Sequence, residues 1–431
     1  MQKASLIGHT IEVYSEFANN SVIPADSILR RFFLNRKYLG SNDRRAIATA
    51  YFGAIKNFLR LEAIAQDAFP TEIHKPELII AAYFILFEKE EPEQVRIYLT
   101  ELPNSFKSDY PRQAFQAMAD RDREDHRLGA LAADEKLSIL HSFPLWFVKE
   151  IEKEYDTDLV EPLLSSLNAE APTALRANTT LISRDELQKE LAGQGIETEL
   201  SKLSPYGLLL YKRMNIWDLT AFKSGAFEIQ DEASQLVAPF ADIHSNRIKI
   251  LDACAGAGGK TLHFSSLLEN QGEIFATDID ARKLEELKKR VVRSHAQNIR
   301  IVSPDKYDQI IKDKSNWFDI VLLDVPCSGT GTLRRNPSIK WNLTEGMLAE
   351  LIVKQQNILE ANIGYVKSGG EMLYATCSIL KNEGEEQIEW FCKKHPEFQL
   401  EETKRTHPDS DGCDGFFVAR LRKRKNGGAD S

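Results

Sequence analysis

Residues 247–261 read RIKILDACAGAGGKT, and this stretch decides the fold. Ile248 to Leu251 has the length and composition of a short buried strand, and a glycine-rich turn and a helix to about Leu268 follow it directly. Small residues in the turn permit positive φ and let the backbone approach a bound molecule, while the first N–H groups of the helix are free to bind polar groups. The stretch therefore predicts a strand–turn–helix unit that binds a nucleotide-like ligand.

The alternation of strand and helix continues toward the C-terminus. Further strands are predicted at Ile274–Thr277, Ile299–Val302, Ile320–Leu323 and Glu371–Ala375, with helical patterns between most of them. Such a pattern forms a mostly parallel sheet covered by helices on both faces, with ligands bound beyond the carboxyl ends of the strands. The fold class expected here is α/β, Rossmann-like.

The N-terminal half has a different texture. Ser41-Asn42-Asp43 is a predicted helix start, and Leu78–Phe87 is apolar on every side, as expected for the central helix of a bundle. Farther on, Thr173–Asn178 reads as a short strand before a helix that starts near Ser183. The predicted domains are an all-α domain at 1–140, a small α+β module at 141–240 and the α/β domain at 241–425.

Composition narrows the class of protein. The chain has 431 residues, of which 42% are hydrophobic and 28% charged, as in an ordinary soluble protein. It has no apolar run of about 18 residues and no signal-peptide pattern at its start, so we expect a cytoplasmic protein with no membrane partner. The five cysteines form no C-x-x-C pair and the nine histidines do not cluster with them, which predicts reduced thiols and no metal site.

A net charge of −9 does not by itself suggest a nucleic-acid partner, so any RNA-binding surface must be local. Two basic groups qualify, one near the N-terminus and one near the C-terminus. They are Arg30, Arg31, Arg36, Lys37, Arg44, Arg45, Lys56 and Arg60, and then Arg420, Arg422, Lys423, Arg424 and Lys425. A solvated helix face and a soluble tail are the competing interpretation.

Three ligands compete for the glycine-rich turn. A phosphate-binding loop would need glycine at Cys254, and a dinucleotide loop would need glycine at Thr261. S-adenosylmethionine fits better, because Asp278 follows the second strand, where an acidic side chain can bind ribose hydroxyls, and Asp305 follows the third, near the adenine. A helix N-cap is the alternative role for Asp278.

Two cysteines stand at the ends of the fourth and fifth strands, in Asp324-Val325-Pro326-Cys327 and Ala375-Thr376-Cys377. A lone cysteine is usually a small buried hydrophobe, but two at equivalent strand ends point to chemistry. A thiolate that adds to carbon 6 of a cytosine makes carbon 5 nucleophilic enough to accept a methyl group. Asp324 would hold a proton for ring nitrogen 3, and the second cysteine would assist release of the product.

At these residues the chain resembles the Sun (Fmu) family of RNA cytosine 5-methyltransferases, over nearly its whole length. The motifs are QDEASQ at 230–235, the turn at 252–261, PCSGTGTLRRNPSIKW at 326–341, TCS at 376–378 and DGFF at 414–417. The resemblance implies a class I methyltransferase domain after a NusB-like RNA-binding domain and a small α+β domain. It also implies rRNA processing, with ribosomal RNA favoured as substrate and S-adenosylmethionine as cofactor.

Site residues follow from the resemblance. It implies that Cys377 is the nucleophile, that Cys327 aids release, and that Asp324 belongs to the catalytic set. The implied cofactor contacts are Cys254, Ala255, Gly256, Ala257, Gly258, Gly259, Lys260, Asp278, Asp305 and Asp324. The chain departs from the family at Gly256-Ala257, where many members have Ala-Pro, and the loss of the fixed φ of proline should loosen the turn.

Several side chains keep two interpretations. Lys260 either contacts the cofactor or the substrate, or is a solvated lysine in the first turn of the helix. Arg334 and Arg335, in the loop after Cys327, are candidates to bind an RNA phosphate. Trp341 and Phe416 either stack on a flipped base or belong to the core, whereas Cys392 and Cys413 are expected to be structural.

Other functions stay open for the chain as a whole. These are a non-catalytic RNA-binding ribosome-assembly factor, a transfer-RNA cytosine 5-methyltransferase, an amino-group methyltransferase of the same fold and a small-molecule methyltransferase. One catalytic set per chain leads us to expect a monomer.

Overall fold

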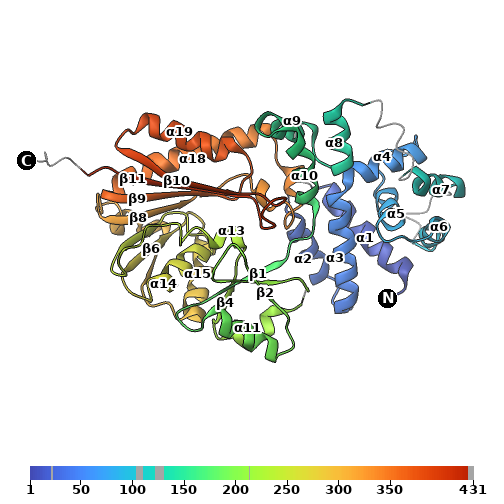
Figure 1. The fold of residues 1–431 in the computed structure, drawn as a ribbon. Helices are drawn as coiled ribbons and strands as arrows, with labels where there is room; N and C mark the ends of the chain where they lie inside the picture. The colour runs from blue at the N-terminus through green and yellow to red at the C-terminus, as the bar shows by residue number, and fades with distance from the viewer. Residues whose placement is uncertain (21–22, 103–109, 122–130, 213, 426–431) are drawn as a thin grey trace, which may run out of the picture. The chain divides into compact units, whose positions relative to one another are not determined.

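A computed structural model describes residues 1–20, 23–102, 110–121, 131–212 and 214–425 (Figure 1). The chain divides into two compact units. Unit 1 comprises Met1–Asn168 and Arg335–Thr344, and unit 2 comprises Ala169–Arg334 and Glu345–Ser431. A ten-residue segment from the C-terminal half of the sequence therefore belongs to the N-terminal unit.

Unit 1 is built from helices, which the sequence predicts for residues 1–140 only. They are α1 (Lys3–Ala18), α2 (Ala25–Leu34), α3 (Ser41–Lys56), α4 (Phe58–Ala68), α5 (Pro76–Leu86), α6 (Pro92–Thr100), α7 (Arg112–Arg121), α8 (Ala133–His141), α9 (Leu145–Glu154), α10 (Thr157–Asn168) and, from the inserted segment, α17 (Ile339–Asn342).

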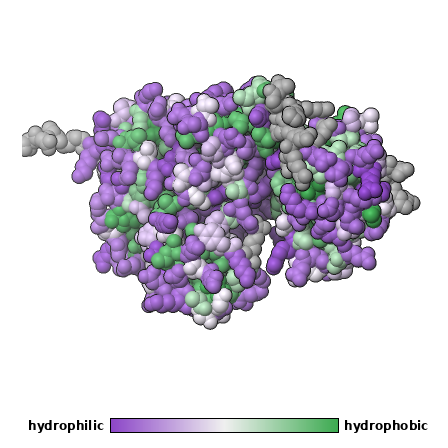
Figure 2. All heavy atoms as spheres, turned by 45° about the vertical axis from the view of Figure 1, so that its right-hand side comes forward, coloured by the Kyte–Doolittle hydropathy of each residue, from purple (hydrophilic) through white to green (hydrophobic). Residues whose placement is uncertain are grey.

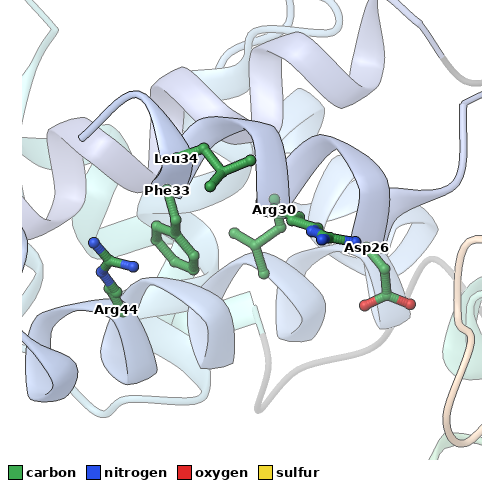
Figure 3. Close-up of a pocket in the computed structure, with 6 residues that line it drawn as sticks. Asp26, Arg30, Phe33, Leu34 and Arg44 are labelled. Carbon is green, nitrogen blue, oxygen red and sulfur yellow. The ribbon is translucent and has the colours of Figure 1, made fainter. Parts of the chain in front are cut away.

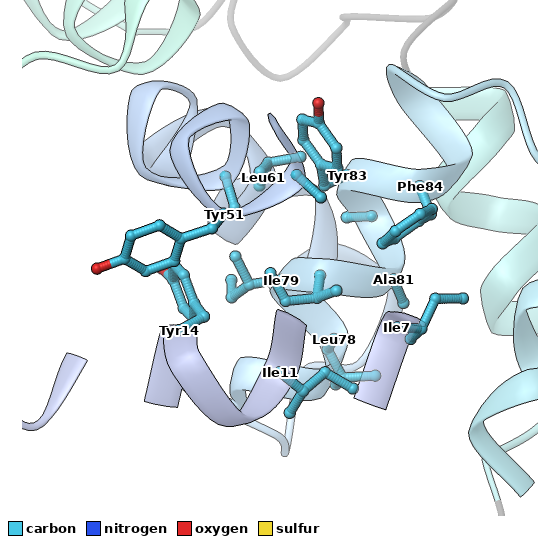
Figure 4. Packing of buried hydrophobic residues seen from close by; sticks show 14 of the residues in the cluster. Ile7, Ile11, Tyr14, Tyr51, Leu61, Leu78, Ile79, Ala81, Tyr83 and Phe84 are labelled. Atoms are coloured by element: carbon cyan, nitrogen blue, oxygen red, sulfur yellow. The ribbon is translucent and has the colours of Figure 1, made fainter. Parts of the chain in front are cut away.

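The core of unit 1 surrounds α5. Every residue from Leu78 to Leu86 is buried, so the prediction of a central helix at Leu78–Phe87 is confirmed except for Phe87, which is exposed. Ile7 and Ile11 of α1, Tyr51 of α3 and Leu61 of α4 belong to the same core cluster (Figure 4). A helix that is apolar on all sides is stable only where neighbours cover it all round.

Unit 2 begins with a small antiparallel sheet of order β2-β3-β1-β4. Its strands are β1 (Thr173–Ala177), β2 (Glu199–Leu200), β3 (Gly207–Leu210) and β4 (Phe227–Ile229). The helices of this part are α11 (Arg184–Gly193), α12 (Thr220–Lys223) and α13 (Glu232–Gln235). Ser183 caps α11 by accepting a hydrogen bond from the N–H of Glu186, which confirms the predicted helix start.

The larger sheet of unit 2 has the order β10-β11-β9-β8-β5-β6-β7. Its strands are β5 (Lys249–Asp252), β6 (Glu273–Thr277), β7 (Ile299–Val302), β8 (Phe318–Asp324), β9 (Val366–Thr376), β10 (Phe398–Thr406) and β11 (Phe416–Lys423). Strands β5 to β9 are parallel, whereas β11 pairs antiparallel with both β9 and β10. The fold is thus the mostly parallel, Rossmann-like sheet that the sequence predicts.

Helices cover both faces of this sheet. They are α14 (Gly259–Leu267), α15 (Ala281–Ser294), α16 (Tyr307–Ile310), α18 (Glu345–Asn362) and α19 (Glu385–Lys394). Along β8, Val321 and Leu323 join one core with Leu359 of α18, while Ile320 and Leu322 join another with Phe264 of α14. A strand buried on both faces reads as a continuous apolar run, which is why β8 was visible in the sequence.

The strand order places the site. The chain runs from β5 through β6 to β7 on one side and then returns to β8 on the other side of β5. Such a reversal opens a crevice at the carboxyl ends of the two central strands, where α/β folds bind their ligands. The glycine-rich turn follows β5 and the first cysteine motif follows β8, so both meet at this edge.

Candidate active site

The glycine-rich turn connects β5 to α14. Gly256 has φ +53° and Gly258 has φ +87°, a conformation that residues with a side chain rarely adopt. A Cβ on Gly258 would lie 2.0 Å from Cδ1 of Leu287, so α15 packs directly against the turn. The Gly256 N–H donates to Oδ2 of Asp278 at 2.9 Å, which ties the turn to the end of β6.

Carboxylates line the strand ends around the turn. Asp252, Asp324 and Asp278 all add to the rise in the pKa of the Cys254 thiol, whose largest cause is burial. Burial also raises the pKa of Asp252 to about 7, against a hydrogen bond from Thr261 that lowers it. The Oδ1 atom of Asp252 is buried and has no hydrogen-bond partner among the described residues.

Asp278 is not the N-cap of the following helix. Asp280 caps α15, because its side chain accepts a hydrogen bond from the N–H of Arg282. Each carboxylate oxygen of Asp278 accepts one backbone N–H, from Gly256 and from Asp280, and keeps a lone pair for a further donor. Asp305 lies just past β7 and is exposed, and a hydrogen bond with Ser303 lowers the pKa of its carboxyl group.

Lys260 bridges the turn and β8. Its Nζ lies 2.6 Å from Oδ2 of Asp324, and its side chain is only 11% exposed, so it is not a solvated lysine. The ammonium also lies 5.2 Å from the centroid of the Phe416 ring. Lys260, Asp324 and Phe416 therefore form one partly buried group beside the glycine-rich turn.

The two cysteines meet. Strands β8 and β9 pair in parallel with Asp324 opposite Ala375, and the Sγ atoms of Cys327 and Cys377 lie 3.3 Å apart. The hydrogen bond with Cys377, and then burial, raise the pKa of the Cys327 thiol well above its ordinary value. Cys327 therefore keeps its proton at neutral pH and can donate it to the sulfur of Cys377.

A buried polar network behind the cysteines was not predicted from the sequence. Glu383 is fully buried and accepts hydrogen bonds from the N–H of Ser328 at 2.8 Å and from Nε2 of Gln355 at 2.9 Å. Thr330 and Ser378, one from each cysteine loop, share a 3.0 Å hydrogen bond. Glutamate in a charged stretch of sequence gives no sign of burial, so only the fold identifies Glu383 as a support of both loops.

Other candidates from the sequence lie elsewhere. Arg334 is 4% exposed and paired with Asp414 at 3.1 Å, so its guanidinium does not fit the proposed phosphate clamp. Trp341 packs in unit 1, where its Nε1 donates to the carbonyl of Ile55. Cys392 packs against the sheet core and Cys413 is buried, which agrees with a structural role for both.

The N-terminal basic group separates into paired and exposed side chains. Arg31 pairs with Glu16 and Arg36 with Glu12, while Lys56 donates to the carbonyl of Asn168. Arg30, Lys37 and Arg45 are exposed, and so is the paired Arg31. A hollow of about 350 Å³ between α2 and α3 is lined by Asp26, Leu29, Arg30, Phe33, Leu34 and Arg44 (Figure 3).

The C-terminal basic group lies in a strand as far as residue 423, where a soluble tail was the competing interpretation. Arg420, Arg422 and Lys423 belong to β11. Arg422 pairs with Glu371 of the neighbouring strand and with Asp242, and Arg420 pairs with Glu402 of β10. The alternation of charged and apolar residues is that of a strand. The ion pairs neutralise the charges of Arg420 and Arg422 within the protein.

Membrane-spanning helices and metal sites are both absent from the described residues. No helix in that part of the chain is long and apolar enough to span a membrane, and hydrophilic residues dominate the face seen in Figure 2. Within the same residues, no group of three or more His, Cys, Asp or Glu side chains is arranged to hold a metal ion. All five cysteines are free thiols.

Comparison with known proteins matches two stretches of the chain to family models. The family model for the 16S rRNA methyltransferase RsmB/F matches residues 241–422, and a model for the ferredoxin-like domain of RsmF/B-like methyltransferases matches residues 143–217. The ribosomal RNA small subunit methyltransferase B of Photorhabdus laumondii is 33% identical over 315 residues, which cover 70% of this chain and 72% of that protein. The corresponding protein of Serratia proteamaculans is 29% identical over 404 residues, which cover 90% of this chain and 92% of that protein.

Solved structures agree in fold. The structure titled PH0851 superposes with a TM-score of 0.77 at 26% identity and covers 98% of this chain and 99% of that one. NSun6 from Pyrococcus horikoshii, solved with SFG, has a TM-score of 0.60 at 21% identity and covers 66% of this chain and 99% of that one. The second likeness bears on the fold alone.

Proposed function

The chain belongs to the RsmB/F family of 16S rRNA methyltransferases, and from that premise we propose that it methylates carbon 5 of a cytosine in small-subunit ribosomal RNA through a covalent adduct with Cys377. The observation that carries the proposal is the cysteine pair, with its sulfur atoms 3.3 Å apart at the edge of the sheet that holds the glycine-rich turn. A fold that only needed to bind RNA would have no use for two adjacent thiols there.

The turn and its carboxylates fit S-adenosylmethionine. When bound, this cofactor supplies an electrophilic methyl group on a sulfonium that carries a positive charge. Asp252, Asp278 and Asp324 make the strand ends acidic, which favours a cationic ligand over nucleotide phosphates. We assign the contacts to residues 254–260, Asp278 for the ribose hydroxyls, Asp305 for the adenine, and Asp324.

Cys377 acts on the cytosine ring. After loss of its proton to solvent, the thiolate of Cys377 forms a bond to carbon 6, and the electron pair of the carbon 5–carbon 6 double bond moves so that carbon 5 becomes nucleophilic. Asp324 holds a proton at ring nitrogen 3, which offsets the negative charge that the addition places on the ring. Lys260, 2.6 Å from Oδ2 of Asp324, orients that carboxyl group.

Cys327 takes part in release. After methylation a water molecule takes the proton from carbon 5, the double bond between carbon 5 and carbon 6 forms again, and the bond between Cys377 and carbon 6 breaks. The electron pair of that bond goes to the sulfur of Cys377, which the thiol of Cys327 stabilises by a hydrogen bond. Cys327 lies 3.3 Å from Cys377 and is held by the network through Ser328 and Glu383. We assign it to this step, so an enzyme without Cys327 should form the adduct and fail to resolve it.

The test uses the full chain with Cys377→Ala, Cys327→Ala and, as a matched control, Cys392→Ala, whose partly buried thiol packs against the sheet core. Each is incubated with S-adenosylmethionine and small-subunit RNA from a strain that lacks the gene. Bisulfite sequencing detects 5-methylcytosine, and denaturing gels detect protein joined to RNA.

The proposal expects one methylated cytosine with the wild type and C392A, no methylation with C377A, and a persistent adduct with C327A. Full activity of C377A would refute its role as nucleophile. Absence of both methylation and adduct with the wild type would favour the assembly-factor function instead, and methylation of transfer RNA alone would change the substrate.

The RNA partner, the state of assembly and the location follow as further parts of the proposal. The exposed cations Arg30, Lys37 and Arg45 offer phosphate contacts on unit 1. One complete catalytic set per chain is enough for a monomer, and ribosomal RNA as substrate favours work in the cytoplasm.

A further inference from the structure

A cluster of four charged side chains lies beside the cofactor turn, and no catalytic step uses it. Glu228 of β4 is 3% exposed and accepts hydrogen bonds from Arg290 at 2.9 and 3.1 Å and from Arg293 at 2.6 and 2.7 Å, both on α15. Arg176 of β1 is 2% exposed and is the third arginine of the group. Within unit 2, the cluster joins the small antiparallel sheet to α15, one of the helices that cover the larger sheet.

Two of these arginines also hold the backbone of the turn. Nη1 of Arg290 donates to the carbonyl of Ala257 at 2.8 Å, and Nη1 of Arg176 donates to the carbonyl of Gly259 at 2.6 Å. The same Arg176 nitrogen also donates to Oε1 of Gln230, a second hydrogen bond that holds the guanidinium. Charge-assisted bonds of this kind are stronger than those between neutral groups.

Burying these charged groups costs more desolvation free energy than a purely structural contact requires. Two guanidinium groups share the Glu228 carboxylate, and a third, that of Arg176, is buried close by without pairing with it. Burial lowers the pKa of Arg176 to about 9, an effect that the charge of Glu228 opposes and that of Arg290 reinforces. Nε of Arg176 is buried without a partner among the described residues. Apolar side chains would pack the same interface at lower cost.

The turn itself needs support from outside. It has glycine at two positive-φ positions, 256 and 258, and alanine at 257, so no proline restricts it. A trans peptide points its carbonyl and its N–H in opposite directions. By holding the Gly259 carbonyl, Arg176 therefore also sets the direction of the Lys260 N–H at the start of α14.

We infer that Arg176 and Arg290 are positioning residues for the cofactor, which fix the carbonyls of Ala257 and Gly259 so that the turn is preformed before S-adenosylmethionine binds. The inference rests on the proposed function. Glu228 holds Arg290 in place by two hydrogen bonds, and Arg293 holds Glu228. The conformational entropy of the turn is then lost when the protein folds, so that cofactor binding does not lose it and the affinity is higher.

The main test measures binding and not turnover. Titration calorimetry with S-adenosylmethionine and with S-adenosylhomocysteine compares the wild type with R290Q, R290K and R176K. Arg282→Gln is the matched control, because Arg282 lies on the same helix and is 92% exposed. The Kd of R290Q should rise by roughly tenfold or more, R290K should recover part of that loss, and R282Q should bind like the wild type.

Two readouts separate positioning from a general loss of stability. Hydrogen exchange without ligand should be faster at residues 255–260 in R290Q, and steady-state kinetics should show a raised KM for the cofactor with kcat kept at saturation. If R290Q lowers the melting temperature but binds within twofold of the wild type, the cluster is only structural and the inference is overturned. If the wild type itself binds no cofactor, the proposed function fails first.

Discussion

Asp252 ends β5 inside the protein, where burial raises the pKa of its carboxyl group from 3.8 to about 7. Between these two values the unfolded chain has lost the proton while the folded chain keeps it. Asp252 therefore favours the folded state at low pH, and this stability is lost as pH rises toward 7, by about 1.4 kcal/mol per pH unit. Above pH 7 the loss levels off.

Asp252→Asn removes this dependence and keeps an oxygen for the hydroxyl of Thr261. We expect the unfolding free energy of the variant minus that of the wild type to rise by about 2 kcal/mol between pH 5.5 and 8.5. Urea denaturation across that range measures it. Asp308→Asn is the control, because Asp308 is 75% exposed; parallel profiles for D252N and D308N would contradict the prediction.

Residues of the candidate site could be predicted from the sequence where a chemically reactive side chain stands at the end of a recognisable strand. Cys327, Cys377 and Asp324 follow strands that the sequence makes visible, and the fold brings them together. Glu383 and Arg176 could not be predicted, because burial of a charged side chain depends on partners far away in the sequence. Charged residues are usually on the surface, so pattern alone assigns both to solvent.

At the scale of the element, the turn between β5 and α14 depends on two glycines that differ in their surroundings. Gly256 has positive φ but nothing within 4 Å of an added Cβ, whereas at Gly258 the Cβ would lie 2.0 Å from Leu287. Gly256→Ala should therefore cost only the backbone strain, about 1 kcal/mol. Gly258→Ala adds a forced movement of α15 and should cost about 3 kcal/mol.

Chemical denaturation of both variants checks the difference, with hydrogen exchange at the first turn of α14 as a local readout. Equal costs would mean that Leu287 moves aside freely. Because Leu287 is fully buried, we expect that it cannot.

Strands differ in how far the sequence reveals them. Ile299–Val302 was predicted with the bounds of β7, and the predicted Ile320–Leu323 lies within β8. The last two strands, β10 and β11, were not predicted, because β10 is mostly exposed and charged and β11 alternates apolar residues with arginines. An edge strand has no apolar run to mark it, and its pairing with β11 appears only in the folded sheet.

The whole molecule is divided in a way that the order of the sequence hides. Residues 335–344 follow the Cys327 loop and Arg334, yet they complete the helical unit. Trp341 packs edge to face on Phe58 there, and Ser338 accepts a hydrogen bond from the N–H of Ala25. The predicted boundaries at 140 and 240 rest on changes of texture along the chain, and such changes cannot reveal a segment that returns to an earlier unit.

Lys340 is the centre of this inserted segment. It is 4% exposed, and its Nζ donates to the carbonyls of Lys56 and Ser142, each at 3.0 Å, and to Oδ1 of Asn168. These oxygens stand at the C-terminal ends of α3, α8 and α10, where helix dipoles favour a cation. Burial lowers the pKa of Lys340, and the three oxygens offset that cost.

Lys340→Met should therefore destabilise unit 1 by about 3 kcal/mol, because it removes the ammonium that donates to three oxygens at buried or partly buried helix ends. Hydrogen exchange should quicken by roughly a hundredfold in the last turns of α3, α8 and α10 and stay unchanged in β5 and β8 of unit 2. Lys37→Met, at an exposed position of unit 1, is the control. Equal acceleration in both units would mean that the chain unfolds as one body, and no acceleration would mean that Lys340 contributes nothing to holding the segment.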